Sequence, residues 1–329
     1  MKKSTLFKHT TVPYPVLSEE QFAEEMKTQV LPLLDALRKP FRLKISDSLS
    51  LYGETFCPEN ASKTLVIVHG FTESCDKYRE MIYYFLKEGF AVCIYEQRGH
   101  GRSRGGLPRD CTHVHRFQDY IDDLDAVLFR VVKKQLPGPY CLFAHSMGGL
   151  VGGLYLEQHP DVFSKAIFNA PMFEVNRGGM SWGKAWMATK MMCLTGKGAT
   201  RMPGQGIFSP QEDFPNSAAT SYPRYRFYFR HQVKHEYLQH AGASVQWLHE
   251  GLSGGAKLVR PKNCAKVTIP VLLFQAEHDT YVLPGGQNRF MELVPNGTLL
   301  TVPGAKHEVY LSENNTLRYY VQAVMDFLK

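Results

Sequence analysis

Ser146 lies in the stretch of the chain best suited to chemistry, Ala144-His145-Ser146-Met147-Gly148. An apolar run of strand length, residues 140–143, precedes it, and a glycine-rich stretch follows. A serine between a buried strand and a helix stands on a sharp turn that exposes its hydroxyl as a nucleophile. Ala144 replaces the usual first glycine of this pattern and adds a methyl group to a crowded turn. The pattern therefore predicts a nucleophile only if an acid and a histidine accompany it.

Two further segments supply an acid and a histidine in the order that such a serine needs. Asp279 follows the strand-like run 270–275, and His307 follows the next one, 298–302. The C-terminal ends of parallel strands are where open α/β sheets place their sites. We expect His307 to take the proton of Ser146 and Asp279 to orient the imidazole. Glu277 is the alternative acid, and each residue taken alone would more often be a turn or loop residue.

Backbone N–H groups for an oxyanion are also predicted. The buried-strand pattern at residues 64–68 leads into His69-Gly70-Phe71, where glycine lets the chain turn and Phe71 offers its N–H. Met147, directly after the serine, offers the second N–H at the positive end of its helix. His69 is expected to be a structural residue, because His307 fits the role of the base better.

Composition limits the other classes of function. The chain has 329 residues, a hydrophobic content of 44% and a formal net charge of +7, and it contains neither an 18-residue apolar run nor a signal-peptide pattern. We therefore expect a cytoplasmic protein, either free or peripheral on the inner face of the membrane. The seven cysteines form no CxxC pair, and His113-Val114-His115 has no third ligand nearby. No metal and no cofactor are predicted.

Strand and helix patterns alternate from about residue 41, which predicts an α/β fold with a mostly parallel sheet and helices on both faces. The alternation stops after residues 166–169 and resumes near 266, and this interval is too long for an ordinary connection. The predicted organisation is a partly helical N-terminal segment at 1–40, a core in two parts at 41–171 and 263–329, and an inserted cap, or lid, at 172–262.

The predicted cap carries the positive charge of the chain. Between residues 177 and 260, Lys and Arg exceed Asp and Glu by seven, which equals the net charge of the whole protein. Arg226, Arg230 and Lys234 would form one basic stripe on a helix, facing either an anionic membrane or solvent. Trp182 and Trp186 are expected in the core of the cap or in a slot for an acyl chain. The arginines among aromatic residues at 222–230 also occur in single-strand nucleic-acid binders, but packing of a cap helix explains them better.

Several segments together resemble the α/β-hydrolase superfamily and, within it, the bacterial lysophospholipase and monoacylglycerol lipase group. The resemblance covers about residues 20–329 and rests on five stretches: 69–71, 97–103, 113–120, 144–149 and 305–308. In that group Ala144 is ordinary, whereas Glu96 stands where many relatives have aspartate. The resemblance implies the α/β-hydrolase fold with an inserted cap, and hydrolysis of a single-chain lipid ester without metal or organic cofactor.

The expected function is cleavage of the carboxylic ester of a single-chain lipid, most of all a lysophospholipid, through an acyl-enzyme on Ser146. A monoacylglycerol lipase or general carboxylesterase would share the same residues, and a lipid acyltransferase would pass the acyl group to another lipid. An aminopeptidase would need an acidic group for the substrate amine, which the basic cap disfavours, and a binding protein usually lacks one of the three catalytic side chains. Neither nucleic acid nor an obligatory protein partner is expected.

Overall fold

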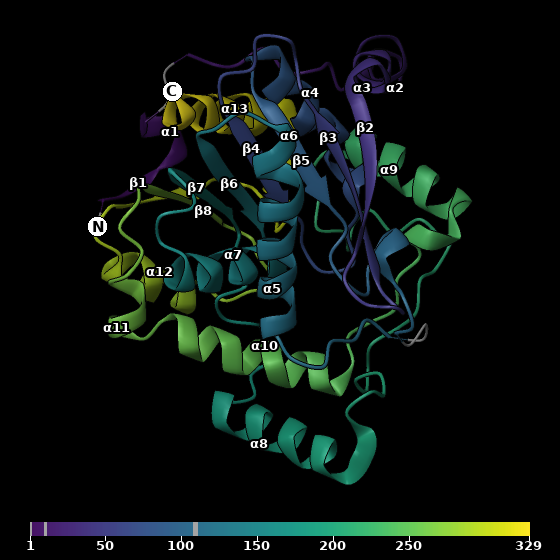
Figure 1. Cartoon of the computed structure of the whole chain (residues 1–329), viewed down its shortest axis with the longest axis vertical. Helices are drawn as coiled ribbons and strands as arrows, with labels where there is room; N and C mark the ends of the chain where they lie inside the picture. The colour runs from purple at the N-terminus through teal and green to yellow at the C-terminus, as the bar shows by residue number, and fades with distance from the viewer. Residues whose placement is uncertain (1, 10–11, 108–110) are drawn as a thin grey trace.

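A single twisted sheet forms the centre of the molecule in this computed structural model, which describes residues 2–9, 12–107 and 111–329. Within the described residues the strand order is β1-β9-β8-β7-β6-β4-β5-β3-β2 (Figure 1). All pairs from β1 to β5 in this order are parallel, whereas β3 and β2 join as antiparallel strands at one edge. The predicted mostly parallel sheet is confirmed. The strands are β1 (Lys2–Thr5), β2 (Arg38–Lys44), β3 (Ser50–Phe56), β4 (Thr64–Val68), β5 (Ala91–Tyr95), β6 (Tyr140–His145), β7 (Lys165–Asn169), β8 (Val271–Ala276) and β9 (Gly297–Val302).

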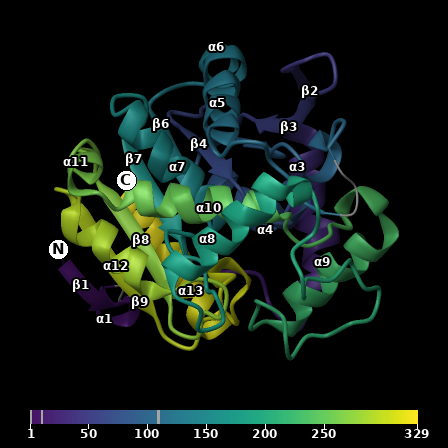
Figure 2. The same cartoon turned by 90° about the horizontal axis from the view of Figure 1, so that it is seen from below.

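Helices cover both faces of this sheet, as Figures 1 and 2 show. The described α-helices are α1 (Leu6–His9), α2 (Phe22–Glu25), α3 (Leu31–Leu37), α4 (Arg79–Lys87), α5 (Gln118–Val127), α6 (Lys133–Gln135), α7 (Met147–Gln158), α8 (Trp182–Met192), α9 (Tyr222–Lys234), α10 (Val245–Leu258), α11 (Pro261–Cys264), α12 (Pro284–Leu293) and α13 (Asn314–Leu328). The short segment η1 (Met26–Val30) joins α2 to α3, and η4 (Leu128–Val132) joins α5 to α6.

Two apolar cores, one on each face, hold the helices to the sheet. Every residue of β4 is buried, and its side chains alternate between the cores: Val66 packs among residues of α5 and α7, and Ile67 among residues of α4 and α13. A central parallel strand is covered on both faces, so it needs the continuous apolar run that made it recognisable.

The two ends of the sheet differ from the sequence-based expectation. Strand β1 pairs in parallel with β9 at Lys2–Thr5, whereas only partial helix was predicted in residues 1–40. Its four residues are polar and carry no apolar pattern, so nothing in the sequence marked them as a strand. Strand β2 begins at Arg38 rather than near 41. Residues 1, 10 and 11 of this predicted segment lie outside the described residues.

The predicted cap interval, 172–262, divides into two groups of helices. Helix α8 packs on α10, which in turn packs on α7 in the core. Helix α9 instead contacts α2, far from α8 in both views of Figures 1 and 2. The proposed boundaries of a single cap stay a prediction, since α10 is part of the packing around the central sheet.

Candidate active site

Ser146 occupies a strained turn between β6 and α7. Its backbone has φ +51° and ψ −118°, a conformation that non-glycine residues rarely adopt. The turn is tight because α7 begins against the end of β4: a Cβ on Gly148 would lie 2.1 Å from the carbonyl oxygen of Val68. Ser146 is therefore held where the strand stops, with its side chain directed out of the sheet edge by the backbone itself.

Ala144 fits this turn without difficulty. Its methyl group is fully buried in the core on the α7 side of the sheet, facing Gly152 of that helix. A Cβ on Gly152 would lie 3.5 Å from the Ala144 methyl and 2.7 Å from a methyl of Leu142. The Ala144 methyl group thus has room in the core because residue 152 of the facing helix is a glycine.

The structure brings the three predicted side chains into one chain of hydrogen bonds. Ser146 Oγ lies 2.8 Å from His307 Nε2, and His307 Nδ1 lies 2.7 Å from Asp279 Oδ2. His307 and Ser146 are each only 6% exposed. The arrangement allows the imidazole to accept the serine proton through Nε2 while the carboxylate holds the Nδ1–H form.

Asp279 rather than Glu277 contacts the histidine. The other Asp279 oxygen accepts the backbone N–H groups of Tyr281 and Val282 at 2.8 and 3.0 Å. Burial alone would raise the pKa of Asp279, but the hydrogen bond and charge of His307, with those N–H groups, lower it below its usual value. Glu277 points away, accepting the N–H of Gly304 at 2.8 Å, and its side chain is half exposed.

The predicted oxyanion donors flank Ser146 on its two sides. Met147 opens helix α7, and Phe71 follows the end of β4 with its ring 4.4 Å from that of Trp247 in α10. A Cβ on Gly70 would lie 3.1 Å from the Ser146 Cβ, so this loop passes directly beside Ser146. In the part of the chain that the structure describes, neither the N–H of Phe71 nor that of Met147 has a hydrogen-bond partner.

Glu73 is a central residue of the site that the sequence did not reveal. Its buried carboxylate accepts the N–H of Gly70, the hydroxyl of Tyr78 at 2.6 Å and the hydroxyl of Tyr310. Lys77 lies 3.3 Å from the same carboxylate. Burial opposes the charge of Glu73, but Lys77, followed by His145 and the two tyrosines, lowers its pKa. Glu73 therefore fixes the loop that carries Phe71. A glutamate three residues after Gly70 was the only available signal.

Lys77 links this loop to the segment that carries the histidine. Its ammonium contacts both Glu73 and Glu308, the residue after His307. Burial favours the neutral amine, but the two carboxylates outweigh it and raise the pKa of Lys77. The loop of Phe71 and the loop of His307 thus share one cation.

His69 has the structural role predicted for it. Its Nε2 accepts the N–H of Gln97 at 3.0 Å, and its Nδ1 lies 2.7 Å from the carbonyl oxygen of Gly70. Burial lowers the pKa of this histidine, which keeps it neutral.

Glu96, where many relatives have aspartate, is also satisfied. Its buried carboxylate binds the guanidinium and the backbone N–H of Arg102. A Cβ on Gly101 would lie 2.4 Å from a Glu96 oxygen, so glycine there leaves room for the longer acid.

The predicted binding residues of the inserted interval lie outside this arrangement. The indole N–H groups of Trp182 and Trp186 donate to Leu252 O at 3.3 Å and Ser253 Oγ at 2.9 Å, so both rings pack on α10. Arg226, Arg230 and Lys234 all belong to α9 and line a cavity toward the N-terminal helices.

Neither a metal site nor a membrane-spanning helix is found among the described residues. The described side chains form no His, Cys, Asp and Glu group that could hold a metal ion. His113 contacts Ser244 at 2.9 Å and His115 at 3.4 Å. Among the helices of the described residues, none is long and apolar enough to cross a membrane.

Comparison with known proteins places this geometry in a family. The family model described as serine aminopeptidase S33 matches residues 59–315. Lysophospholipase L2 of Escherichia coli (strain K12) is 30% identical over 318 residues, covering 90% of this chain and 89% of that protein. Probable lysophospholipase L2 of Haemophilus influenzae is 25% identical and covers 95% of this chain and 99% of its own length.

Solved structures agree on the fold. A soluble variant of monoglyceride lipase from Saccharomyces cerevisiae has a TM-score of 0.68 at 18% identity, over 89% of this chain and 96% of that one. The predicted fold class and the resemblance to the lysophospholipase and monoacylglycerol lipase group are confirmed. The chain belongs to the serine aminopeptidase S33 family of α/β-hydrolases.

Proposed function

We propose that this protein hydrolyses the carboxylic ester of a single-chain lipid, with a lysophospholipid as the preferred substrate and Ser146 as the nucleophile. The observation that carries this proposal is the chain of hydrogen bonds from Ser146 through His307 to Asp279, built on a strained elbow. The relatives named lysophospholipase and monoglyceride lipase support the ester and the single acyl chain.

The reaction has two steps. His307 Nε2 takes the Ser146 proton as Oγ attacks the ester carbonyl, and the N–H groups of Phe71 and Met147 bind the resulting oxyanion. Collapse of the intermediate breaks the ester bond, and His307 gives its proton to the departing alcohol. Water, deprotonated by His307, then releases the fatty acid from Ser146 by the same route in reverse.

Peptide substrates are disfavoured despite the family's description. An aminopeptidase needs a free carboxylate to bind the substrate amine, whereas Glu73 and Glu308, the acids beside the site, are both paired with Lys77. The excess of basic residues in the inserted interval, residues 172–262, favours an anionic substrate or surface instead. We propose that this interval forms the cap.

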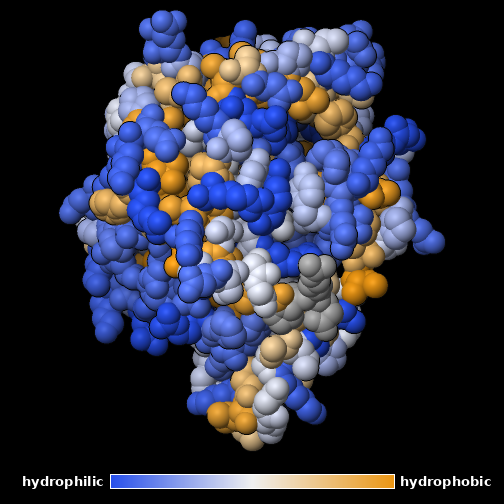
Figure 3. All heavy atoms as spheres, turned by 45° about the vertical axis from the view of Figure 1, so that its right-hand side comes forward, coloured by the Kyte–Doolittle hydropathy of each residue, from blue (hydrophilic) through white to orange (hydrophobic). Residues whose placement is uncertain are grey.

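Membrane contact belongs to the proposal as well, and we assign it to α8. Five large apolar side chains of this helix and its flanks are exposed, namely Met180, Trp182, Met187, Met191 and Leu194. Lys184, Lys190 and Lys197 lie among them, without any acidic residue from 181 to 197. Figure 3 shows apolar and polar spheres side by side at this lowest part of the molecule. An apolar face with basic neighbours suits the interface of an anionic bilayer.

The test is a substrate panel of lysophospholipids, monoacylglycerols, short nitrophenyl esters and aminoacyl nitroanilides, with Ser146→Ala as the control. We expect the highest kcat/KM for lysophospholipids and no cleavage of the nitroanilides. Cleavage of monoacylglycerols alone would move the assignment to a monoacylglycerol lipase. A second lipid added to the assay would reveal an acyltransferase by the appearance of a diacyl product.

A further inference from the structure

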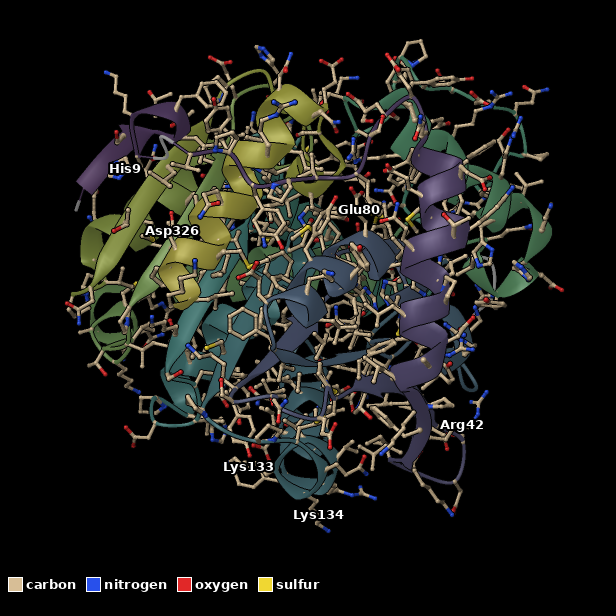
Figure 4. All side chains as sticks on the ribbon, turned by 90° about the horizontal axis from the view of Figure 1, so that it is seen from above. His9, Arg42, Glu80, Lys133, Lys134 and Asp326 are labelled. Carbon is tan, nitrogen blue, oxygen red and sulfur yellow. The ribbon has the colours of Figure 1, made fainter. Side chains whose placement is uncertain are left out.

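A cavity of about 690 Å³ lies away from Ser146, between the N-terminal helices and α9. Residues 19–38, which include α2 and α3, form one wall, and α9 forms the opposite wall. The N-terminal helices and α9 lie side by side in Figures 1 and 4. Its volume is in the range of sites for drug-sized ligands. Ser146, Asp279 and His307 do not line this cavity. Lys77 and Tyr228 line it and contact Glu308 and Ser74, which lie on the side of the candidate active site.

The floor of the cavity is apolar. The apolar side chains that remain exposed or partly exposed are Ala23 and Leu31 on the N-terminal wall and Pro223 and Phe227 on α9. Beneath them lie the buried side chains of Phe22, Met26 and Leu34, with Phe22 and Phe227 in edge-to-face contact at 5.7 Å. Such a surface binds hydrocarbon, because removing methylene groups from water is favourable.

The α9 side of the rim is basic and part of its charge is unpaired, whereas the opposite wall also carries Glu19, Glu20 and Asp35. Arg230 and Lys234 on α9, and Lys27 on the opposite wall, have no ion pair within the described residues. Arg226 has Glu212 only at 3.8 Å, and its Nε is buried without a hydrogen-bond partner.

The other arginines of the cavity are already paired. Arg224 is fully buried against Glu80, which Figure 4 labels beside the N-terminal helix. Arg79 binds Glu54 and Asp76, and Arg38 binds Asp35. The unpaired cations thus lie at the mouth: Arg230 and Lys234 on the α9 stripe that the sequence singled out, and Lys27 on the opposite wall.

We propose that this cavity is a second binding site, for a monomeric single-chain anionic amphiphile whose head contacts Arg226, Arg230 and Lys234 and whose chain lies on the apolar floor. A fatty carboxylate has this chemistry. The proposal goes beyond the proposed reaction and does not need it, because no bond is made or broken at the site.

The experiment measures binding of dodecanoate, below its micelle concentration, to the full chain by calorimetry. Dodecanol tests the need for charge, and acetate tests the need for the chain. Arg230→Glu with Lys234→Glu reverses two exposed rim charges, and Lys134→Glu with Lys262→Glu makes the same net change elsewhere. Ala23→Trp fills the cavity from an exposed position of α2 without changing charge.

We expect dodecanoate to bind the wild-type chain and the Lys134/Lys262 control alike. The rim reversal should weaken binding at least about tenfold, and Ala23→Trp should remove the same component. Equal binding to wild type and both cavity variants would overturn the proposal, as would equal affinity for dodecanol or acetate. Loss of binding to anionic vesicles in the rim variant, without monomer binding, would instead make the stripe a membrane surface. Failure of lipid hydrolysis would leave these results unaffected, because no turnover is measured.

Discussion

The surroundings of Ser146 and the inserted interval use polar residues in opposite ways. Around Ser146 almost every polar group is buried and bonded to a fixed partner: Asp279 to His307, Glu73 to Gly70, Lys77 to Glu308. In the inserted interval, α8 and α9 turn charged and apolar side chains outward with few partners. The first arrangement holds groups ready for a reaction, and the second leaves them available for something outside the chain.

The largest expected effect is at the nucleophile and the base. Ser146→Ala and His307→Ala should each lower kcat about a millionfold, because either change breaks the proton path. The measurement is ester hydrolysis by variants whose circular dichroism matches the wild type. Near-normal turnover by a folded Ser146→Ala protein would refute the mechanism.

The acid should follow with a smaller effect. Asp279→Asn removes the negative charge that holds His307 in the tautomer protonated on Nδ1. We expect kcat to fall about ten-thousandfold. Glu277→Gln, two residues away and half exposed, is the matched control and should leave kcat within a few-fold of wild type. The opposite ranking would transfer the role to Glu277.

Glu73 offers a way to test how much the buried network beside Ser146 contributes to the stability of the fold. Glu73→Gln leaves Lys77 with one carboxylate, and we expect the free energy of unfolding to fall by about 3 kcal/mol. Lys77→Met combined with Glu73→Gln should cost less than the sum of the two single losses, because each single change leaves the other member of the pair without that partner. Urea unfolding of both single variants and the double variant measures the coupling, and additive losses would show that the pair is not coupled.

Acid should destabilise the same region through His145. Burial, opposed in part by Glu73, lowers the pKa of His145 to about 4 from its ordinary value of about 6.5. Its contribution to stability is complete above pH 6.5, is lost as the pH falls from 6.5 to 4, and amounts to about 3 kcal/mol. His145→Gln should flatten the unfolding free energy over this range, whereas substitution of the exposed His278 should not. Identical pH profiles for wild type and His145→Gln would contradict the prediction.

The smallest effect is expected at the outer surface. Met187→Ser with Met191→Ser should reduce partitioning onto anionic vesicles by roughly tenfold, since two exposed apolar side chains no longer enter the interface. Val12→Ser, an exposed apolar residue outside the interval, is the control. Vesicle sedimentation measures the partitioning, and a larger loss from charge reversal at Arg226, Arg230 and Lys234 would assign the contact to α9.

Sequence patterns predicted the parts of this site that follow directly from a strand. Ser146, Asp279 and His307 each come just after an apolar run, and the parallel sheet brings those ends to one edge. Whether Glu277 or Asp279 is the acid depends on which side chain points toward His307 within one turn. The hydrophobic pattern of the sequence does not determine this direction. Glu73 was missed because its partners come from distant segments, among them Tyr310.

The inserted interval was the least predictable region for a related reason. The interval was expected to form one inserted cap, but its helix α9 packs on α2, some 200 positions earlier in the chain. The stripe of Arg226, Arg230 and Lys234 was correctly placed on one helix, yet the cavity that it borders depends on that long-range contact.

The cation of Lys77 has a consequence for how the site survives thermal motion. It joins Glu73, on the side of the oxyanion donors, to Glu308, on the side of the base. These two sides belong to opposite ends of the sequence, and each could drift by a loop movement of its own. Because one ammonium contacts both carboxylates, it fixes the distance between the loop of Phe71 and the loop of His307. Neither loop can move away without breaking a buried ion pair.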